Sequence, residues 1–141
     1  MNTSPLNGYV GYALRRAQGV LFADFSDTLA ELGLRPAQFA ALSLLRQNPG
    51  VSQSSVCVAL GVQKANFVAI IGKLEKCGLV TRRKSDTDAR TYALEITSRG
   101  RRTLRRATER LARHEGRITA RLGPKGRAHL LELLEKLSEL D

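Results

Sequence analysis

The chain has 141 residues and a formal net charge of +10, because 23 lysines and arginines face 13 aspartates and glutamates. Its length fits one domain or one elongated subunit and excludes a multidomain enzyme. Charged residues interrupt every apolar stretch before it reaches the roughly 20 residues that span a bilayer, and no basic-then-apolar leader opens the chain. We therefore expect a soluble, cytoplasmic protein with a polyanionic partner, for which nucleic acid is the leading candidate.

Helices are predicted over most of the first 77 residues. Apolar residues recur at spacings of three and four, and Pro36, Ser52 and Gly61 suit a first helical position, an N-cap and a left-handed C-cap. A tight turn separates the last two helices, so residues 52–77 are expected to form a helix-turn-helix. The four expected helices cover residues 8–32, 36–47, 52–60 and 63–77.

A charged β-hairpin and two more helices are predicted to follow. Two segments of alternating character flank a polar turn, and Thr97 or Ser98 can cap a long helix that Gly123-Pro124 breaks. The last helix carries more leucine than a small helix can hide within its own subunit, so we expect it to meet a partner. The expected strands cover residues 79–84 and 90–96, with the turn at 85–89 between them, and the two expected helices cover residues 98–122 and 125–140. The predicted fold class is therefore mainly α with a small β-hairpin.

The positive charge is concentrated in two segments. Residues 63–90 carry a net +4, and residues 99–121 carry a net +7 because nine arginines face two glutamates. A charge run alone is as typical of a solvated surface without a partner as it is of a binding surface. The neighbouring motifs have to decide between these two interpretations.

Several short motifs occur in a fixed order along the chain. The stretches 34–42, 53–62 and 74–80 are followed by Asp86-x-Asp88-x-Arg90 and then by Leu94-x-Ile96-Thr97-x-x-Gly100. In this order they resemble the MarR family of winged helix-turn-helix transcription regulators, with a small difference of spacing in the wing. The resemblance implies a homodimeric, sequence-specific DNA-binding regulator, in most cases a repressor, that binds a pseudo-palindromic operator in double-stranded DNA.

The resemblance also implies how the chain is divided. Residues 1–141 would form a single MarR-like subunit, with a winged helix-turn-helix DNA-binding region at 34–97 and a helical dimerisation region formed by 1–33 and 98–141. The leucine-rich C-terminus and the apolar start of the first helix are expected to meet a second copy. The candidate interface residues are Tyr9, Val10, Leu14, Ile118, Leu122, Leu130, Leu133, Leu134 and Leu137.

The second helix of the helix-turn-helix supplies the first candidate DNA contacts. In such motifs this helix enters the major groove and its first polar side chains reach the base edges. Gln63, Lys64 and Asn66 occupy that end, and Lys73 lies further along, toward phosphate. The alternative explanation for these residues is ordinary solvated helix polarity. Phe67 belongs instead to the apolar stripe of the same helix.

The other candidate DNA contacts lie at the start of the preceding helix and in the hairpin. The first backbone N–H groups of a helix have no acceptor within the helix, so they can donate to phosphate. A basic hairpin can lie along the sugar-phosphate backbone. The helix-start candidates are Gln53, Ser54 and Ser55, and the hairpin candidates are Arg82, Arg83, Lys84 and Arg90. The resemblance implies that Asp86 and Asp88 orient the wing, with Asp88 holding Arg90 by a salt bridge.

Members of the MarR family commonly release DNA when a small aromatic anion binds between the first, second and long fifth helices. Arg35 stands where the family usually has Ser or Thr, and a helix N-terminus beside an arginine suits an anion. With the stretch 11–18 and Asn66-Phe67-Val68, it makes the chain similar to members that sense hydroxycinnamoyl-CoA thioesters in aromatic catabolism. The candidate effector residues, each of which core packing or solvation also explains, are Arg15, Arg16, Phe22, Phe25, Arg35, Phe39 and His114.

Other functional classes find less support in the sequence. No Gly-rich phosphate loop, nucleophile elbow or metalloprotease motif indicates an enzyme, and no cofactor is expected. Cys57 and Cys77 lie outside the first helix, where family redox sensors carry their thiol, and two histidines are too few for zinc, so neither redox control nor a metal is expected. A non-specific architectural DNA-binding protein without effector control remains the alternative, because basic charge alone would serve it.

Overall fold

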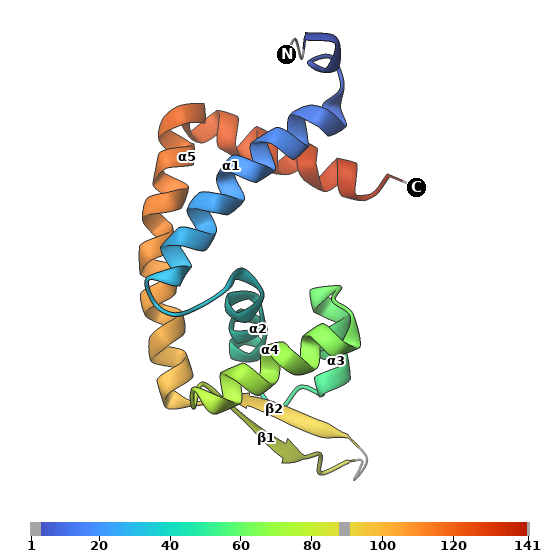
Figure 1. The fold of residues 1–141 in the computed structure, drawn as a ribbon, viewed down its shortest axis with the longest axis vertical. Helices are drawn as coiled ribbons and strands as arrows, with labels where there is room; N and C mark the ends of the chain where they lie inside the picture. The colour runs from blue at the N-terminus through green and yellow to red at the C-terminus, as the bar shows by residue number, and fades with distance from the viewer. Residues whose placement is uncertain (1–3, 88–90, 141) are drawn as a thin grey trace.

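The computed structural model describes residues 4–87 and 91–140 of the chain. Figure 1 shows a long helix, α5, along one side of the molecule, with α1 leaning against its upper half and the other elements gathered around its lower end. A short 3-10 turn at Ser4–Leu6 precedes the first helix. The elements are α1 (Val10–Ala30), α2 (Pro36–Gln47), α3 (Gln53–Leu60), α4 (Lys64–Lys76), β1 (Val80–Lys84), β2 (Tyr92–Ile96) and α5 (Ser98–Ser138).

The predicted mainly α fold with one β-hairpin is confirmed, with helix and strand ends within two residues of those expected for α1 to β2. Local signals explain this agreement, since Pro36 is the first residue of α2 and Gly61 ends α3 with a φ of 62°. The predicted break at Gly123-Pro124 takes the form of a kink inside α5, where Gly123 has a φ of 73° and a ψ of 159°. Glycine adopts this conformation without strain, and Pro124 is tolerated because it restarts the helix in its first turn.

The hydrophobic core lies in the lower half of the molecule. Many of its most buried side chains come from α2, α4 and β2, including Leu42, Leu45, Phe67 and Leu94, each at most 1% exposed. One face of α5 and the end of α1 close this core from the side. The helix-turn-helix and the hairpin are therefore fixed relative to one another by shared packing. The α5 and α1 core residues are Leu104, Ala107, Leu111 and Leu29.

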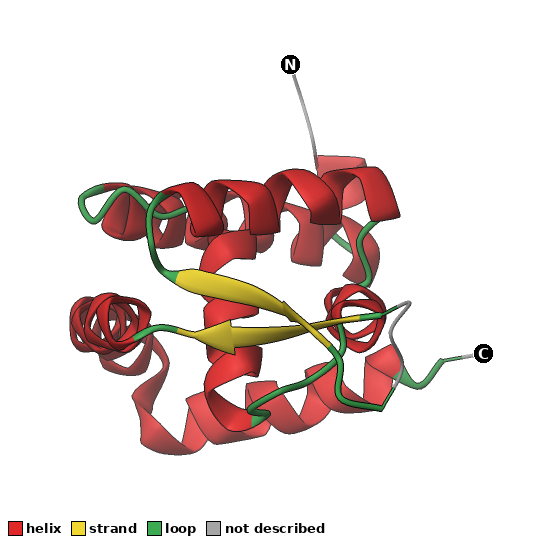
Figure 2. Cartoon of the chain, turned by 90° about the horizontal axis from the view of Figure 1, so that it is seen from below, coloured by secondary structure: helices red, strands yellow, loops and turns green. Residues whose placement is uncertain are grey.

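Backbone pairing fixes the hairpin to the helices on both sides. The strands β1 and β2 are antiparallel, with Val80 opposite Ile96, and they cross beneath the helices in the view from below (Figure 2). The Leu94 amide donates to the Val51 carbonyl at 3.0 Å, just before α3. The Thr97 hydroxyl donates to the Gly78 carbonyl at 2.7 Å, just after α4. These bonds set the direction in which the hairpin projects.

Two kinds of feature are not found in the part of the chain that the structure describes. No single helix there is both long and apolar enough to cross a membrane, and α3 and α4 meet that test only as a pair, across a bend of 114°. In the same residues, no group of three or more His, Cys, Asp or Glu side chains could hold a metal ion.

Candidate DNA interface and ligand cavity

The α4 helix presents the predicted base-reading residues on its exposed side. Its apolar face packs into the core through Phe67, which is 1% exposed and so is a core residue, as predicted. Lys64 and Asn66 lie in the first turn of the helix and are exposed, and Gln63 precedes them as an N-cap whose side chain makes no capping bond. Lys73 is exposed in the last turn. All four polar side chains are therefore available to a partner.

The start of α3 is organised by a serine cap. The Ser52 hydroxyl accepts a hydrogen bond from the Ser55 amide at 3.1 Å and lies 2.7 Å from the Ser55 hydroxyl. Ser54 is exposed beside them. The Gln53 side-chain oxygen is buried without a hydrogen-bond partner, so this residue faces the protein more than its neighbours do. The exposed Ser54 hydroxyl is therefore available to an anion at this helix start.

Two arginines of the hairpin are already paired with acids. Arg82 Nη2 donates to Glu75 Oε1 of α4 at 2.8 Å, and its guanidinium lies 5.6 Å from the centre of the Tyr92 ring. Arg83 donates to Asp86 at 3.1 Å and to Glu95 at 2.9 Å. The hydrogen bonds to Asp86 and then Glu95 raise the pKa of the Arg83 guanidinium above its usual value. Charges matched in this way attract phosphate less than free ones do.

Some of the remaining hairpin predictions concern residues that the structure describes, and others fall outside them. Lys84 is exposed and makes no ion pair among the described residues, so its charge is free. Asp86 binds a wing arginine as expected of an orienting residue, although its partner is Arg83. Asp88 and Arg90, together with the predicted salt bridge between them, lie outside the described residues.

A cavity of about 770 Å³ lies between α1 and the two halves of α5. Four of the predicted effector residues line it, namely Arg15, Phe22, Phe25 and His114. Three residues predicted for the dimer interface also line it, which are Leu14, Leu130 and Leu134. The lining is mostly apolar, with Arg15 at an exposed position and His114 at a buried one. An elongated ligand with an aromatic end and an anionic end fits this distribution.

A hydrogen-bonded group of Asp24, His114 and Arg117 joins α1 to α5 beside the cavity. His114 Nδ1 lies 2.5 Å from Asp24 Oδ2, and Arg117 donates to both oxygens of the same carboxylate, at 2.8 and 2.6 Å. The Arg117 and His114 hydrogen bonds lower the pKa of the Asp24 carboxyl. The Phe25 ring meets the imidazole edge to face, with 5.7 Å between ring centres.

The other three predicted effector residues do not line this cavity. Arg16 lies on another side of α1, with its guanidinium 5.9 Å from the centre of the Tyr12 ring. Arg35 is the exposed N-cap residue of α2, where its backbone amide donates to the Gln38 side chain at 2.9 Å. Phe39 packs edge to face against Phe25, 5.9 Å between ring centres, from the core side. Phe39 therefore supports one wall of the cavity without reaching its surface.

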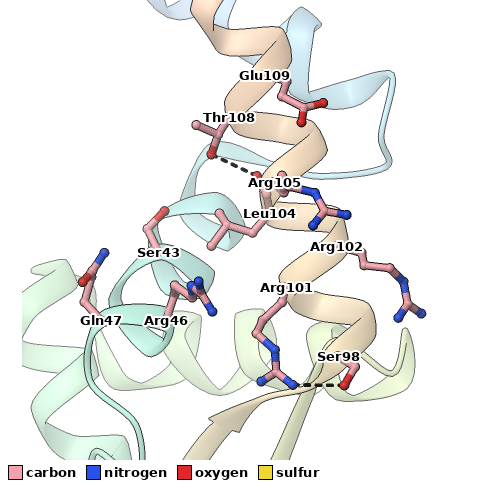
Figure 3. Close-up of a pocket in the computed structure, with 10 residues that line it drawn as sticks. All are labelled: Ser43, Arg46, Gln47, Ser98, Arg101, Arg102, Leu104, Arg105, Thr108 and Glu109. Atoms are coloured by element: carbon pink, nitrogen blue, oxygen red, sulfur yellow. Dashed lines mark hydrogen bonds between the residues drawn. The ribbon is translucent and has the colours of Figure 1, made fainter.

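A second hollow, of about 650 Å³, separates the end of α2 from the start of α5 (Figure 3). Arg46 of α2 and Arg101, Arg102 and Arg105 of α5 line it. Arg101 donates to the Ile96 carbonyl at 2.9 Å, and none of the four arginines forms an ion pair among the described residues. This cleft therefore concentrates positive charge next to the hairpin.

The predicted dimer residues lie on the outside of the chain. Tyr9 and Val10 are 66% and 62% exposed, and Leu133 and Leu137 are each 42% exposed. The others are exposed or half-buried, which leaves an apolar surface on α1 and on the end of α5. Those other residues are Leu14, Ile118, Leu122, Leu130 and Leu134.

Several residues of these sites have no signal in the sequence. Asp24 and Arg117 are 93 positions apart, and their pairing with His114 depends on how α1 packs against α5. Glu75 and Glu95 neutralise hairpin arginines from elements that the sequence treats separately. Leu21 and Gln18 could have been added to the cavity lining from their helical spacing with Leu14 and Arg15.

Comparisons with known proteins assign the chain to a family. A model described as MarR family matches residues 32–91. A Thauera aromatica protein named for regulation of the hcr operon is 35% identical over 95% of this chain and 81% of its own length. An HTH-type transcriptional repressor of Mycobacterium tuberculosis is 32% identical over 91% of this chain and 92% of its own length. The chain belongs to the MarR family. It is a DNA-binding transcriptional repressor of the MarR type with a winged-helix fold.

Solved structures of the MarR repressor CouR are similar to the whole chain. One, bound to a 23-mer DNA duplex, has a TM-score of 0.94 and 41% identity over 99% of both chains. Another, bound to p-coumaroyl-CoA, has a TM-score of 0.90 and 39% identity over 100% of this chain and 99% of its own. The similarity therefore includes the helices that surround the cavity as well as the DNA-binding region.

Proposed function

We infer that this MarR-family chain is a homodimeric repressor that binds a pseudo-palindromic operator and leaves it when an aromatic acyl-CoA thioester binds. The observation that carries this proposal is the cavity between α1 and α5, whose apolar lining includes Phe22 and Phe25 and whose exposed residues include Arg15. An aromatic acyl group suits the apolar part, and the anionic coenzyme A end suits the exposed Arg15 side chain. The similarity to CouR bound to DNA and to p-coumaroyl-CoA supports both halves of the proposal.

The proposed DNA contacts come from α4, the start of α3 and the hairpin. Lys64 and Asn66 would reach base edges, because they are exposed at the N-terminal end of the recognition helix. Lys73 and Lys84 would lie against phosphate, since their charges are free among the described residues. A two-fold dimer would place two such surfaces about one helical turn of DNA apart.

The first experiment is fluorescence anisotropy of the purified protein on duplex from its own upstream region and on scrambled duplex. We expect the upstream duplex to bind about 10³-fold or more tightly than the scrambled one. Adding p-coumaroyl-CoA or feruloyl-CoA should release the upstream duplex, whereas the free acids should not. Equal affinity for both duplexes would favour the architectural alternative, and specific binding that no thioester releases would remove the effector.

Salt dependence tests the extent of the basic footprint. Three free lysines per subunit, Lys64, Lys73 and Lys84, would neutralise about six phosphates per dimer. The logarithm of the affinity should then fall with the logarithm of salt concentration at a slope of about −5, and additional arginine contacts would steepen it toward about −9. A slope near −2 would contradict an extended footprint.

Each of the two proposed sites can be tested with a variant and a matched control. Lys64→Ala should weaken operator binding by about 1–3 kcal/mol if the lysine reads a base, while Lys125→Ala, on the far segment of α5, should leave it unchanged.

Arg15→Ala should weaken thioester binding about tenfold through the loss of a charge-assisted contact. Arg16→Ala is its control, because Arg16 lies on another side of α1. Equal effects of the two arginine variants would contradict the placement of the ligand.

A further inference from the structure

His114 is an unusual residue for the wall of an apolar cavity. It is 4% exposed, and it and Gln38 are the buried polar side chains of the described core. The Gln38 side-chain oxygen has a partner in the Arg35 amide. His114 lines the cavity with one ring nitrogen engaged by Asp24 and the other available.

The surroundings of the imidazole fix which nitrogen is left for a ligand. Two oxygens of Asp24 accept hydrogen bonds from Arg117, and these bonds lower the pKa of that carboxyl, so it is an ionised acceptor. His114 Nδ1, 2.5 Å from Asp24 Oδ2, must therefore be the donor in their bond. The other ring nitrogen, Nε2, is then the one that can bind a ligand.

The Nε2 atom has no hydrogen-bond partner among the described residues, and it does not belong to their fully enclosed unpaired atoms. The ring cannot turn freely, since Asp24 holds one side and the Phe25 ring packs against it edge to face at 5.7 Å. The structure thus holds this imidazole in a fixed orientation at the wall of a cavity whose neighbouring side chains, Leu21, Phe22 and Phe25, are apolar.

We propose that His114 Nε2 forms a hydrogen bond with a ring hydroxyl of the aromatic effector, so that the cavity selects hydroxyaryl groups over unsubstituted ones. The inference rests on the effector half of the proposed function and names the chemical class of the acyl group. The ring enters with its hydroxyl toward buried His114, and the carbonyl end points toward exposed Arg15. Asp24 acts as a positioning residue through the imidazole.

Hydrogen-bond energetics give the expected selectivity. A ligand without a hydroxyl removes water from around Nε2 and leaves this nitrogen unpaired, which is the costly case for a buried polar group. Sites built to bind a hydroxyl reject analogues that lack it far more strongly than apolar pockets distinguish ligands by size. We expect a preference of at least about tenfold for the hydroxylated ligand.

The test on the wild-type protein is calorimetric titration with p-coumaroyl-CoA and cinnamoyl-CoA. The first carries the phenol and the second lacks it. Binding of p-coumaroyl-CoA at least about tenfold tighter than cinnamoyl-CoA would support the proposal. Equal binding of the two would overturn it while leaving the proposed function intact. Binding of neither would overturn the effector half of the proposed function as well.

Two variants separate ligand recognition from structural support. His114→Asn keeps a side-chain amide that can donate to Asp24 but has no Nε2, and His114→Phe removes both groups while retaining an aromatic ring. We expect each variant to lose the preference for p-coumaroyl-CoA and to bind cinnamoyl-CoA within about threefold of the wild type. Operator affinity and the midpoint of thermal unfolding report on folding. An equal loss of affinity for both thioesters in variants that still bind the operator would overturn the proposal.

Discussion

The winged helix-turn-helix and the helices that surround it differ in how they bury their apolar side chains. Between Leu34 and Leu111 the chain completes a core in which most large apolar side chains are fully enclosed. In contrast, the first two-thirds of α1 and the segment of α5 beyond His114 contain no buried residue in the described ranges. Most of the large exposed apolar residues lie there, including Val10, Val20 and Leu131.

This difference separates two ways in which one chain uses hydrophobic residues. The lower region is stabilised by contacts within a single subunit, as expected for a region that must present α4 and the hairpin in fixed positions. The upper region leaves a face that a second copy would cover under the proposed dimer, and it also encloses the ligand cavity. Under the proposed function, rigidity and DNA recognition belong to one region, and association and ligand binding to the other.

The largest expected effect is on stability and tests the core of the lower region. Phe67→Ala should lower the free energy of unfolding by about 3–5 kcal/mol, because the ring is 1% exposed and its removal leaves a cavity. The adjacent Val68→Ala, at a side chain 47% exposed, should change it by less than about 1 kcal/mol. Urea denaturation followed by circular dichroism, at one protein concentration, measures both. Similar losses for the two variants would contradict the assignment of the α4 core face.

The junction between the regions contains a glycine that tolerates no side chain. A Cβ on Gly100 would lie 2.2 Å from the Leu79 carbonyl oxygen and 2.7 Å from an Ile96 carbon. Gly100→Ala should therefore destabilise the protein by about 2–3 kcal/mol through overpacking at the start of α5. Gly116→Ala, where nothing lies within 4 Å, should stabilise it by about 0.5–1 kcal/mol because alanine favours helix. Thermal unfolding of the two variants should shift in opposite directions.

The upper region can be tested through association. Leu133→Lys should weaken the proposed dimer by about 2 kcal/mol, because it places a charge on the leucine face of the last segment. Leu131→Lys, on another face of the same segment, is the matched control and should have less effect. Sedimentation velocity over a range of concentrations measures the association constant. A wild-type protein that stays monomeric at micromolar concentration would remove the dimer from the proposal.

The smallest expected effect concerns the ion pairs beside the cavity. Folding lowers the pKa of Asp24 through Arg117 and His114, so the ionised carboxylate contributes stability above the ordinary value of 3.8. This contribution should disappear as the pH falls through the lowered pKa. The wild type should therefore exceed Asp24→Asn in urea midpoint at pH 7, and the gap should narrow below about pH 4. Asp27→Asn, at an exposed residue without an ion pair among the described residues, should show no such gap.

Local signals in the sequence predicted most of the fold and the exposure of the candidate DNA contacts on α4. The cap at Ser52, the proline that starts α2 and the polar first turn of α4 each depend on neighbours a few residues away. The residues that line the cavity were predicted less completely, since Arg15 and Arg16 are adjacent in the sequence and only Arg15 lines it. Successive residues on a helix point about 100° apart, and periodicity alone does not say which direction meets another helix.

The sequence by itself determined the family, the order of the helices and hairpin, and the region of strongest positive charge, because these depend on composition, short motifs and local backbone preference. Only the tertiary structure decided which charges are free. It pairs Arg82 with Glu75 and Arg83 with Glu95, and it holds His114 against Asp24 across 90 positions of sequence. Side chains from distant segments meet only when helices pack, so the availability of a charge or a ring nitrogen is a property of the fold.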